Sequence, residues 1–387
     1  MKQAEPVSRH YFDWAATAIP DTDTVTGSIP SPELFGNASS KYLEGKKARL
    51  ALEDARARCA LVLGVKPETL YFTSGGTESN AIVLHSLLLR VSKPAFLYSA
   101  VEHPSIQNSA GVLKRLGLKA VSIGAEKDGR ISAETLGEAM EKLPALRFAA
   151  IMAVNNEVGS VMDMPSLSRV IRSKPGAPIH FHSDLVQAAG KIPLDIPLWD
   201  LDSASLSAHK LGGPKGIGLL YLKKPLEPLN PGNQERGIRP GTENVPGALS
   251  FALCLEKHAS AGALKAASKE AEQRMAFFIT KLKKINRCIL IPQDRNAEDK
   301  RFSPWILQMR FKDVPGEVLV RALDSSGIAC STGSACSSSS PERPVLEAMG
   351  LDAHARLEGI RISQGWTTNR EDFEALTAAI EKALAFL

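Results

Sequence analysis

Apolar residues along this chain fall into two alternating patterns, which predict strands and helices in turn. Leu70–Thr73, Ala95–Ser99 and the run 148–153 have the length and composition of buried strands. In the segment 42–63, apolar residues recur at helical spacing, and Gly64 follows as a helix stop. Because strands separated by helices imply right-handed crossovers, we expect an α/β fold with a mostly parallel sheet.

The alternation changes near residue 245, which predicts two domains. Before this point we expect further helices at 81–91, from 105, at 133–143 and at 166–172, and further strands at 119–123 and 178–182. After it we expect helices at 245–260, 266–285, 315–323 and 370–386, and short strands at 288–291, 306–311 and 359–363. We therefore predict a large domain over residues 16–245 and a smaller α+β domain formed by residues 1–15 and 246–387.

Composition is that of an ordinary globular protein, since 44% of the 387 residues are hydrophobic and 23% are charged. The net charge of +5 is modest, and no block of lysine and arginine favours direct binding to nucleic acid. No apolar run is long enough to span a bilayer, so we expect no membrane association. Residues 1–10 lack the apolar core of a signal peptide.

The cysteines indicate a reducing, cytoplasmic setting. Their number, five, is odd, and no CxxC spacing occurs, which argues against a disulfide framework or a zinc site. Cys59, Cys254 and Cys288 lie in apolar segments and read as core residues, and Cys330 ends an apolar strand. Cys336 instead lies among serines and a glycine, where a nucleophile on a mobile loop makes better sense than a structural thiol.

Lys210 is the residue around which the candidate chemistry gathers. It follows Ser207 and His209 and precedes paired glycines, in the bend between two predicted strands. A lysine held there can be desolvated, which lowers its pKa and makes the amine nucleophilic enough to form a Schiff base with an aldehyde cofactor. A solvated loop lysine is the plainer alternative.

A glycine-rich turn supplies a candidate phosphate site. Gly75, Gly76 and Thr77 lie between the strand Leu70–Thr73 and the next predicted helix, where free N–H groups and the helix dipole favour an anion. The turn lacks the Gly-Lys-Ser/Thr of a nucleoside-triphosphate loop, and many such turns bind nothing.

Several polar residues fall just past strand ends, where ligands bind in open α/β sheets. They are Thr77, His103, Asn156, Asp184, Gln187, Ser207 and Lys210. Together they describe one pocket with a phosphate cradle, a carboxylate and a lysine, which is what pyridoxal 5'-phosphate requires.

Two further features have competing interpretations. His180 and His182 share a strand face and could ligate a metal, but no cluster of further ligands lies nearby in sequence, so we expect a buried histidine pair and no metal. Arg361 lies among apolar neighbours on the strand 359–363, where it would bind a substrate carboxylate or form a structural salt bridge.

These motifs together resemble the cysteine desulfurases, within the class V branch of the fold-type I pyridoxal-phosphate enzymes. The similarity runs nearly end to end, and its most specific segments are Ser-Ala-His-Lys at 207–210 and Ser-Thr-Gly-Ser-Ala-Cys at 331–336. The resemblance implies a large domain with a mostly parallel, seven-stranded type of sheet flanked by helices. It also implies a small domain that carries a mobile catalytic-cysteine loop at about 330–342.

The resemblance implies a role for each cofactor residue. Lys210 would hold the cofactor and move protons, His103 would stack on the ring as an acid or base, and Asp184 would pair with the pyridine nitrogen. The ring and its hydroxyl would face Asn156 and Gln187. The phosphate would be bound by Gly76, Thr77, Ser207 and His209, with Thr242 acting from the partner subunit of a homodimer.

By the same resemblance, Arg361 and Asn156 would bind L-cysteine, and Cys336 would take its sulfur as a persulfide, leaving L-alanine. The sulfur would pass to an acceptor protein for iron–sulfur cluster, cofactor or tRNA synthesis. A selenocysteine lyase or another C–S or C–Se lyase is the nearest alternative, and a catalytically quiet, partner-binding subunit is a more distant one. The chain departs from the family pattern at Ala38, Tyr42, Gln364 and Trp366. With Leu387 as the last residue, the resemblance leads us to expect no scaffold-docking extension of the kind that some members have.

Overall fold

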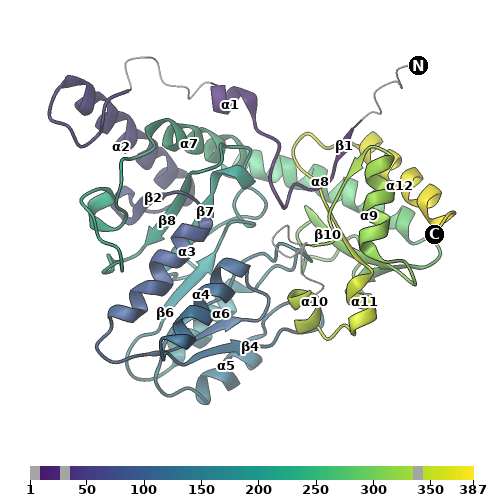
Figure 1. Ribbon diagram of the computed structural model, residues 1–387, viewed down its shortest axis with the longest axis horizontal. Helices are drawn as coiled ribbons and strands as arrows, with labels where there is room; N and C mark the ends of the chain where they lie inside the picture. The colour runs from purple at the N-terminus through teal and green to yellow at the C-terminus, as the bar shows by residue number, and fades with distance from the viewer. Residues whose placement is uncertain (1–8, 27–34, 334–342) are drawn as a thin grey trace.

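The structure, a computed structural model, describes residues 9–26, 35–333 and 343–387. Its larger part is built on a seven-stranded sheet with the strand order β2-β8-β7-β6-β5-β3-β4 (Figure 1). The strands are β2 (Leu70–Thr73), β3 (Ala95–Ser99), β4 (Ala120–Ile123), β5 (Leu146–Ala150), β6 (His180–Asp184), β7 (Ser203–Ser207) and β8 (Gly218–Leu222). All pairs are parallel except those of β8, which is antiparallel to both of its neighbours. The expected mostly parallel α/β sheet is therefore confirmed.

Helices cover both faces of this sheet. They are α2 (Leu43–Leu63), α3 (Gly76–His85), α4 (Pro104–Arg115), α5 (Ala133–Glu141), α6 (Met164–Ser173) and α7 (Val245–Ala259), and the short α1 (Thr22–Thr26) contacts α7. Phe148 and Ala150 of β5 pack in one core with α3 and α4. Ala149, between them, faces the other core, which includes residues of α2, α5, α6 and α7. Burial on both faces explains why these strands read as continuous apolar runs.

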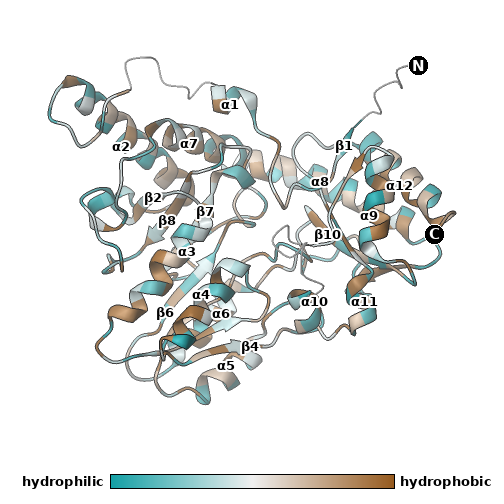
Figure 2. Cartoon of the chain, viewed as in Figure 1, coloured by the Kyte–Doolittle hydropathy of each residue, from teal (hydrophilic) through white to brown (hydrophobic). Residues whose placement is uncertain are grey.

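The smaller part combines two small sheets with helices. β9 (Cys288–Ile291), β10 (Ile306–Phe311) and β12 (Gly359–Ser363) form an antiparallel sheet, and β1 (His10–Tyr11) pairs in parallel with β11 (Ile328–Ala329). The helices are α8 (Ala261–Leu282), α9 (Gly316–Ser325), α10 (Pro344–Ala348), α11 (Ala353–Leu357) and α12 (Arg370–Leu384). Hydrophobic and hydrophilic residues both occur along α9 and α12 (Figure 2), and Leu319, Phe373 and Ile380 are among their buried residues. These residues belong to a core separate from those of the large sheet.

The helix α7 decides where the domains divide. Its buried residues, Phe251 and Leu255 among them, share a core with Leu52 and Cys59 of α2. We therefore propose that the large domain extends through α7, beyond the boundary at residue 245 that the sequence pattern favours. β1 pairs with β11, which supports grouping the first residues of the chain with the small domain.

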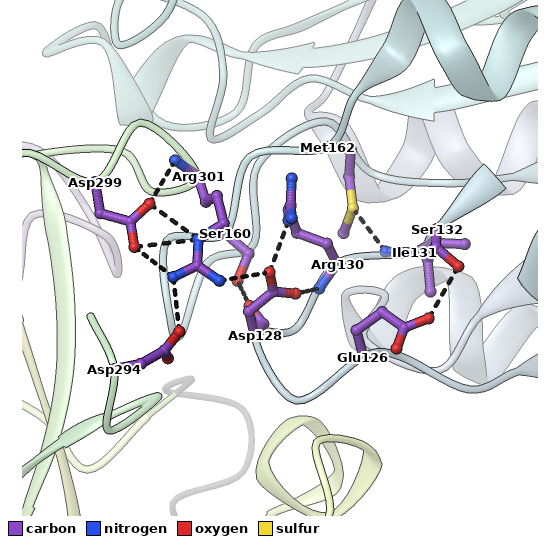
Figure 3. Close-up of polar contacts among 10 residues, drawn as sticks. All are labelled: Glu126, Asp128, Arg130, Ile131, Ser132, Ser160, Met162, Asp294, Asp299 and Arg301. Carbon is purple, nitrogen blue, oxygen red and sulfur yellow. Dashed lines mark hydrogen bonds and ion pairs between the residues drawn. The ribbon is translucent and has the colours of Figure 1, made fainter. Parts of the chain in front are cut away.

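An ion-pair network joins the two parts. Arg301 donates to Asp294 and Asp299 at 2.8 and 2.7 Å, and its other terminal nitrogen lies 3.4 Å from Asp128 of the large domain (Figure 3). Asp128 also accepts from the guanidinium of Arg130 at 2.9 Å. The main chain adds a bridge between Ser160 and Phe302, so this junction is fixed by both side chains and backbone.

Some element boundaries differ from those expected. α3 begins at Gly76 rather than at 81, because the first turn of a helix tolerates glycine where unpaired N–H groups are present anyway. β5 and β6 begin two residues away from 148 and 178. A displacement of two residues leaves every side chain on its expected face of the sheet. Within the described residues, no helix is long and apolar enough to cross a membrane.

Candidate active site

A cavity of about 250 Å³ opens where the parallel strands end. It is lined by Ala15, Ala16, Gly76, Thr77, His103, Met152, Asn156, Asp184, Val186, Gln187, Ser207, His209, Lys210 and Arg361. Most residues singled out from the sequence thus lie around one space. Thr242 is exposed and lies outside this set, and Cys336 falls outside the described residues.

Lys210 reaches the cavity from a short 3₁₀ turn, Ala208–Lys210, between β7 and β8. Its Nζ donates to the carbonyl oxygens of Ala15 and Ala16, each at 2.6 Å. The turn is tight, since a Cβ at Gly213 would lie 2.9 Å from the Cβ of Ala208. The lysine is therefore held by backbone contacts rather than extended into solvent.

Asp184, the last residue of β6, is 4% exposed and accepts a hydrogen bond at each carboxylate oxygen. The Asn80 side chain donates to Oδ2 at 2.8 Å, and the Val186 N–H donates to Oδ1 at 2.9 Å. Sequence reasoning missed Asn80. Its position one helical turn after the glycine-rich turn is the signal that could have found it.

His103 caps the N-terminus of α4. Its Nδ1 accepts from the backbone N–H of Ser105 at 3.1 Å. Burial lowers the pKa of His103, and the charge of Lys210 lowers it further, while Asp184 opposes both effects. The imidazole is therefore neutral near pH 7 and presents its Nε2 side as the free edge.

The phosphate end of the cavity combines a helix N-terminus with hydroxyl donors. Gly75 is the N-cap of α3, and a Cβ at Gly76 would lie 2.6 Å from Cγ2 of Val186, so the backbone approaches closely there. Thr77 and Ser207 line the same space. The pKa of His209 falls to about 4, chiefly through burial and then through Lys210 and other cations. His209 is thus a neutral hydrogen-bonding group.

A second lysine, missed in the sequence analysis, stands behind Gln187. Lys191 is 4% exposed, and its Nζ donates to Oε1 of Gln187 at 2.5 Å. Because Oε1 is occupied, the Gln187 amide turns its NH₂ group toward the carbonyl of Ala15, at 2.8 Å. Burial, with smaller contributions from Lys210 and Arg361, lowers the pKa of Lys191 to about 7.

Arg361 forms the structural salt bridge that one interpretation predicts, and its place in the cavity leaves the carboxylate-binding interpretation as a prediction. It forms a salt bridge with Asp13, whose Oδ1 lies 2.7 Å from Nη2, and its Nη1 donates to the Asn156 carbonyl at 2.8 Å. It also lines the cavity and is only 1% exposed. Among the described residues, no partner is found for its Nε.

Comparisons with known proteins agree with this geometry. The profile described as Aminotransferase class-V matches residues 10–376. A "Cysteine desulfurase IscS" of Dictyoglomus turgidum is 32% identical over 97% of this chain and 94% of its own length, and one of Anaeromyxobacter sp. is 35% identical over 96% and 92%. A solved "NIFS-like protein" superposes with a TM-score of 0.89 at 32% identity, covering 98% of this chain and 100% of that one.

The chain therefore belongs to the class V aminotransferase family, in its cysteine desulfurase branch. Pyridoxal phosphate is the cofactor of this family, and the cavity fits it. Lys210 offers an amine, Asp184 an acceptor for a protonated pyridine nitrogen, and the N-terminus of α3 an anion site.

Proposed function

We propose that this protein is a pyridoxal-phosphate-dependent L-cysteine desulfurase, which converts L-cysteine to L-alanine and leaves the sulfur as a persulfide on Cys336. The observation that carries the proposal is the convergence of Lys210, Asp184, His103 and Arg361 on one cavity. A lysine, a pyridine-nitrogen partner, a ring-stacking histidine and a carboxylate-binding arginine together suit a pyridoxal-phosphate enzyme acting on an amino acid, and the cysteine desulfurases to which the chain is similar favour L-cysteine.

The large domain would hold the cofactor. Lys210 supplies the amine that attaches to it and the base that moves a proton at the substrate α-carbon. Asp184 keeps the pyridine nitrogen protonated, and His103 covers the ring. The phosphate is held by Gly76, Thr77, Ser207 and His209. When bound, pyridoxal phosphate supplies an electron sink conjugated to the α-carbon of the substrate.

Arg361 would orient L-cysteine by its carboxylate. Asp13 and the Asn156 carbonyl already hold two of its nitrogens, which fixes the plane of the guanidinium. A prepositioned guanidinium loses little side-chain freedom when it binds a carboxylate. Asn156 and Gln187 line the same cavity and would face the ring and its hydroxyl.

Cys336 would be the sulfur acceptor in the chain. Burial raises the pKa of every cysteine within the described residues: to about 12 for Cys59, Cys288 and Cys330 and to about 11 for Cys254. These four are thiols at neutral pH and poor nucleophiles. The Cys336 thiolate attacks the substrate sulfur, an S–S bond forms as the Cβ–S bond breaks, and the β-carbon takes a proton to give alanine.

We also propose a homodimer, in which Thr242 reaches the phosphate of the partner subunit. Thr242 is exposed, so it is available for such a contact. The persulfide sulfur would then pass to an acceptor protein that serves iron–sulfur cluster, cofactor or tRNA synthesis. This chemistry needs a reducing compartment such as the cytoplasm, and the four described cysteines are all free thiols.

The test measures alanine and sulfide released from L-cysteine with a reductant, for wild type and Cys336→Ala. We expect both products from wild type, and a Cys336→Ala protein that stays yellow but inactive. A variant as active as wild type would make the protein a lyase, and selenocysteine would be the next substrate. A wild type that stays colourless with added cofactor would favour the partner-binding subunit.

A further inference from the structure

A chain of buried hydrogen bonds connects the cofactor cavity with the two histidines of β6. His182 Nε2 lies 2.9 Å from Oδ1 of Asn80, whose Nδ2 donates to Asp184 at 2.8 Å. On its other side, His182 Nδ1 lies 2.8 Å from the hydroxyl of Ser203, which also lies 2.7 Å from Nε2 of His180. Both nitrogens of His182 are thus engaged by protein groups, which disfavours the metal-site interpretation.

The direction of each bond in this chain is determined. A carboxylate only accepts, so the NH₂ group of Asn80 must face Asp184 and its oxygen must face His182. Burial lowers the pKa of His182 to about 3, so the ring is neutral and its single proton sits on Nε2. Nδ1 then accepts from the Ser203 hydroxyl, and Ser203 in turn accepts from His180.

A second branch runs from the same amide to His103. Asn80 Nδ2 also donates to the Ser105 hydroxyl at 2.9 Å. Ser105 offers its hydroxyl and its backbone N–H to Nδ1 of His103, at 2.9 and 3.1 Å. The proton of neutral His103 therefore lies on Nε2. One amide group thus reaches both side chains assigned to the cofactor ring.

We propose that His182 and Asn80 are positioning residues that orient the two ring-facing groups, holding the Asp184 carboxylate in place as an acceptor and His103 in its Nε2–H tautomer. This inference rests on the cofactor binding that is part of the proposed function. Without the proton on Nε2, His182 could not hold the Asn80 oxygen, and the amide could turn its oxygen toward Asp184. Two facing acceptors repel, so the Asp184 carboxylate would be displaced from the pyridine nitrogen, and that nitrogen would lose its proton more easily.

The test uses the colour of the cofactor-loaded protein, titrated with pH before any substrate is added. Loss of the charge on the pyridine nitrogen makes the nitrogen that joins Lys210 to the cofactor easier to protonate, so the apparent pKa of the chromophore rises. The other titratable and charged groups at this site stay unchanged in all variants: Glu102, His103, Lys191, His209, Lys210 and Arg361.

His182→Leu and Asn80→Asp should each raise the chromophore pKa by about one unit or more and weaken cofactor binding about tenfold. His182→Gln keeps an N–H donor near Asn80 and should stay close to wild type. His85→Leu removes a half-buried histidine of α3 that takes no part in these hydrogen bonds, and it is the matched control.

Three results would overturn the inference. The first is an unchanged chromophore pKa in Asn80→Asp. The second is a chromophore pKa that shifts as far in His182→Gln as in His182→Leu. The third is an equal shift of this pKa in His85→Leu. If His182→Leu does not fold, the chromophore of Asn80→Asp, compared with that of His85→Leu, still decides. A wild type that titrates normally but makes no alanine would refute the proposed function and leave this inference standing.

Discussion

The two walls of the cavity are built differently. On the large-domain wall, Asp184, Asn80 and His103 are joined by hydrogen bonds of 2.8 to 3.1 Å. On the small-domain wall, Arg361 is 1% exposed, yet its buried Nε has no partner among the described residues. Buried polar groups are normally paired. The difference teaches that the groups assigned to the cofactor ring are already hydrogen-bonded to one another in the folded chain, whereas the guanidinium assigned to the substrate keeps one nitrogen without a partner among the described residues.

The largest expected effect on activity comes from removing the Lys210 amine on the large-domain wall of the cavity. Lys210→Ala removes the attaching amine, so the yellow chromophore should be absent after desalting and the release of alanine should fall more than about 1,000-fold. Absorbance and alanine assays measure this. Lys215→Ala, an exposed lysine in the same segment, should behave as wild type. A persistent chromophore in Lys210→Ala would mean that another lysine holds the cofactor.

Substituting Arg361, on the small-domain wall of the cavity, should leave cofactor binding unchanged. Arg361→Gln is expected to raise the KM for L-cysteine about 10- to 100-fold, because a charged hydrogen bond to the carboxylate is lost, with an unchanged chromophore. Asp13→Asn, which removes only the salt-bridge partner, should raise KM much less. Equal KM changes in the two variants would make Arg361 a structural residue.

The buried Lys191, which donates to Gln187 on the large-domain wall, should make the stability of the protein depend on pH. Between pH 7 and 10.5 the unfolded chain binds a proton at Lys191 that the folded chain does not. The free energy of unfolding from this group therefore rises with pH in that window, by up to about 1.4 kcal/mol per pH unit. Lys191→Met should flatten this rise in urea unfolding, and the exposed Lys127→Met should not. An unchanged slope in Lys191→Met would mean that the buried lysine stays charged.

The smallest effect is expected where the two domains meet. Arg301 is partly exposed, so Arg301→Gln should lower the free energy of unfolding by about 1 kcal/mol or less despite its three carboxylate partners (Figure 3). Lys300→Gln, whose side chain is 78% exposed, is the control. A loss of several kcal/mol in Arg301→Gln would show that ion pairs, rather than the backbone bridge, fix the junction.

The parts of the site that the sequence predicted are those that strand order alone brings together. Asp184, Lys210 and Thr77 follow strand ends, and parallel strands end at one edge of a sheet. The elements were predicted well because apolar periodicity reflects burial on local elements. The start of α3 was misplaced because glycine and threonine have low helix propensity, which an N-terminal turn tolerates.

The pairings within the site depend on contacts between positions far apart in the sequence. Asn80 and Asp184 are 104 positions apart, and Arg361 and Asp13 are 348 apart. Lys191 reads as an ordinary charged residue until the fold buries it behind Gln187. Arg361 shows the same limit, because the sequence offered a salt bridge or a ligand site, and only the folded chain could show that one guanidinium faces both Asp13 and the cavity.

The most direct test of the central claim is a single turnover with L-cysteine and no reductant, followed by peptide mass spectrometry. The account predicts one alanine per chain and one added sulfur atom on the peptide that contains Cys336. Cys336→Ser should keep the chromophore and release no alanine. Sulfur on a peptide with Cys59, Cys254, Cys288 or Cys330, or alanine from Cys336→Ser, would contradict it.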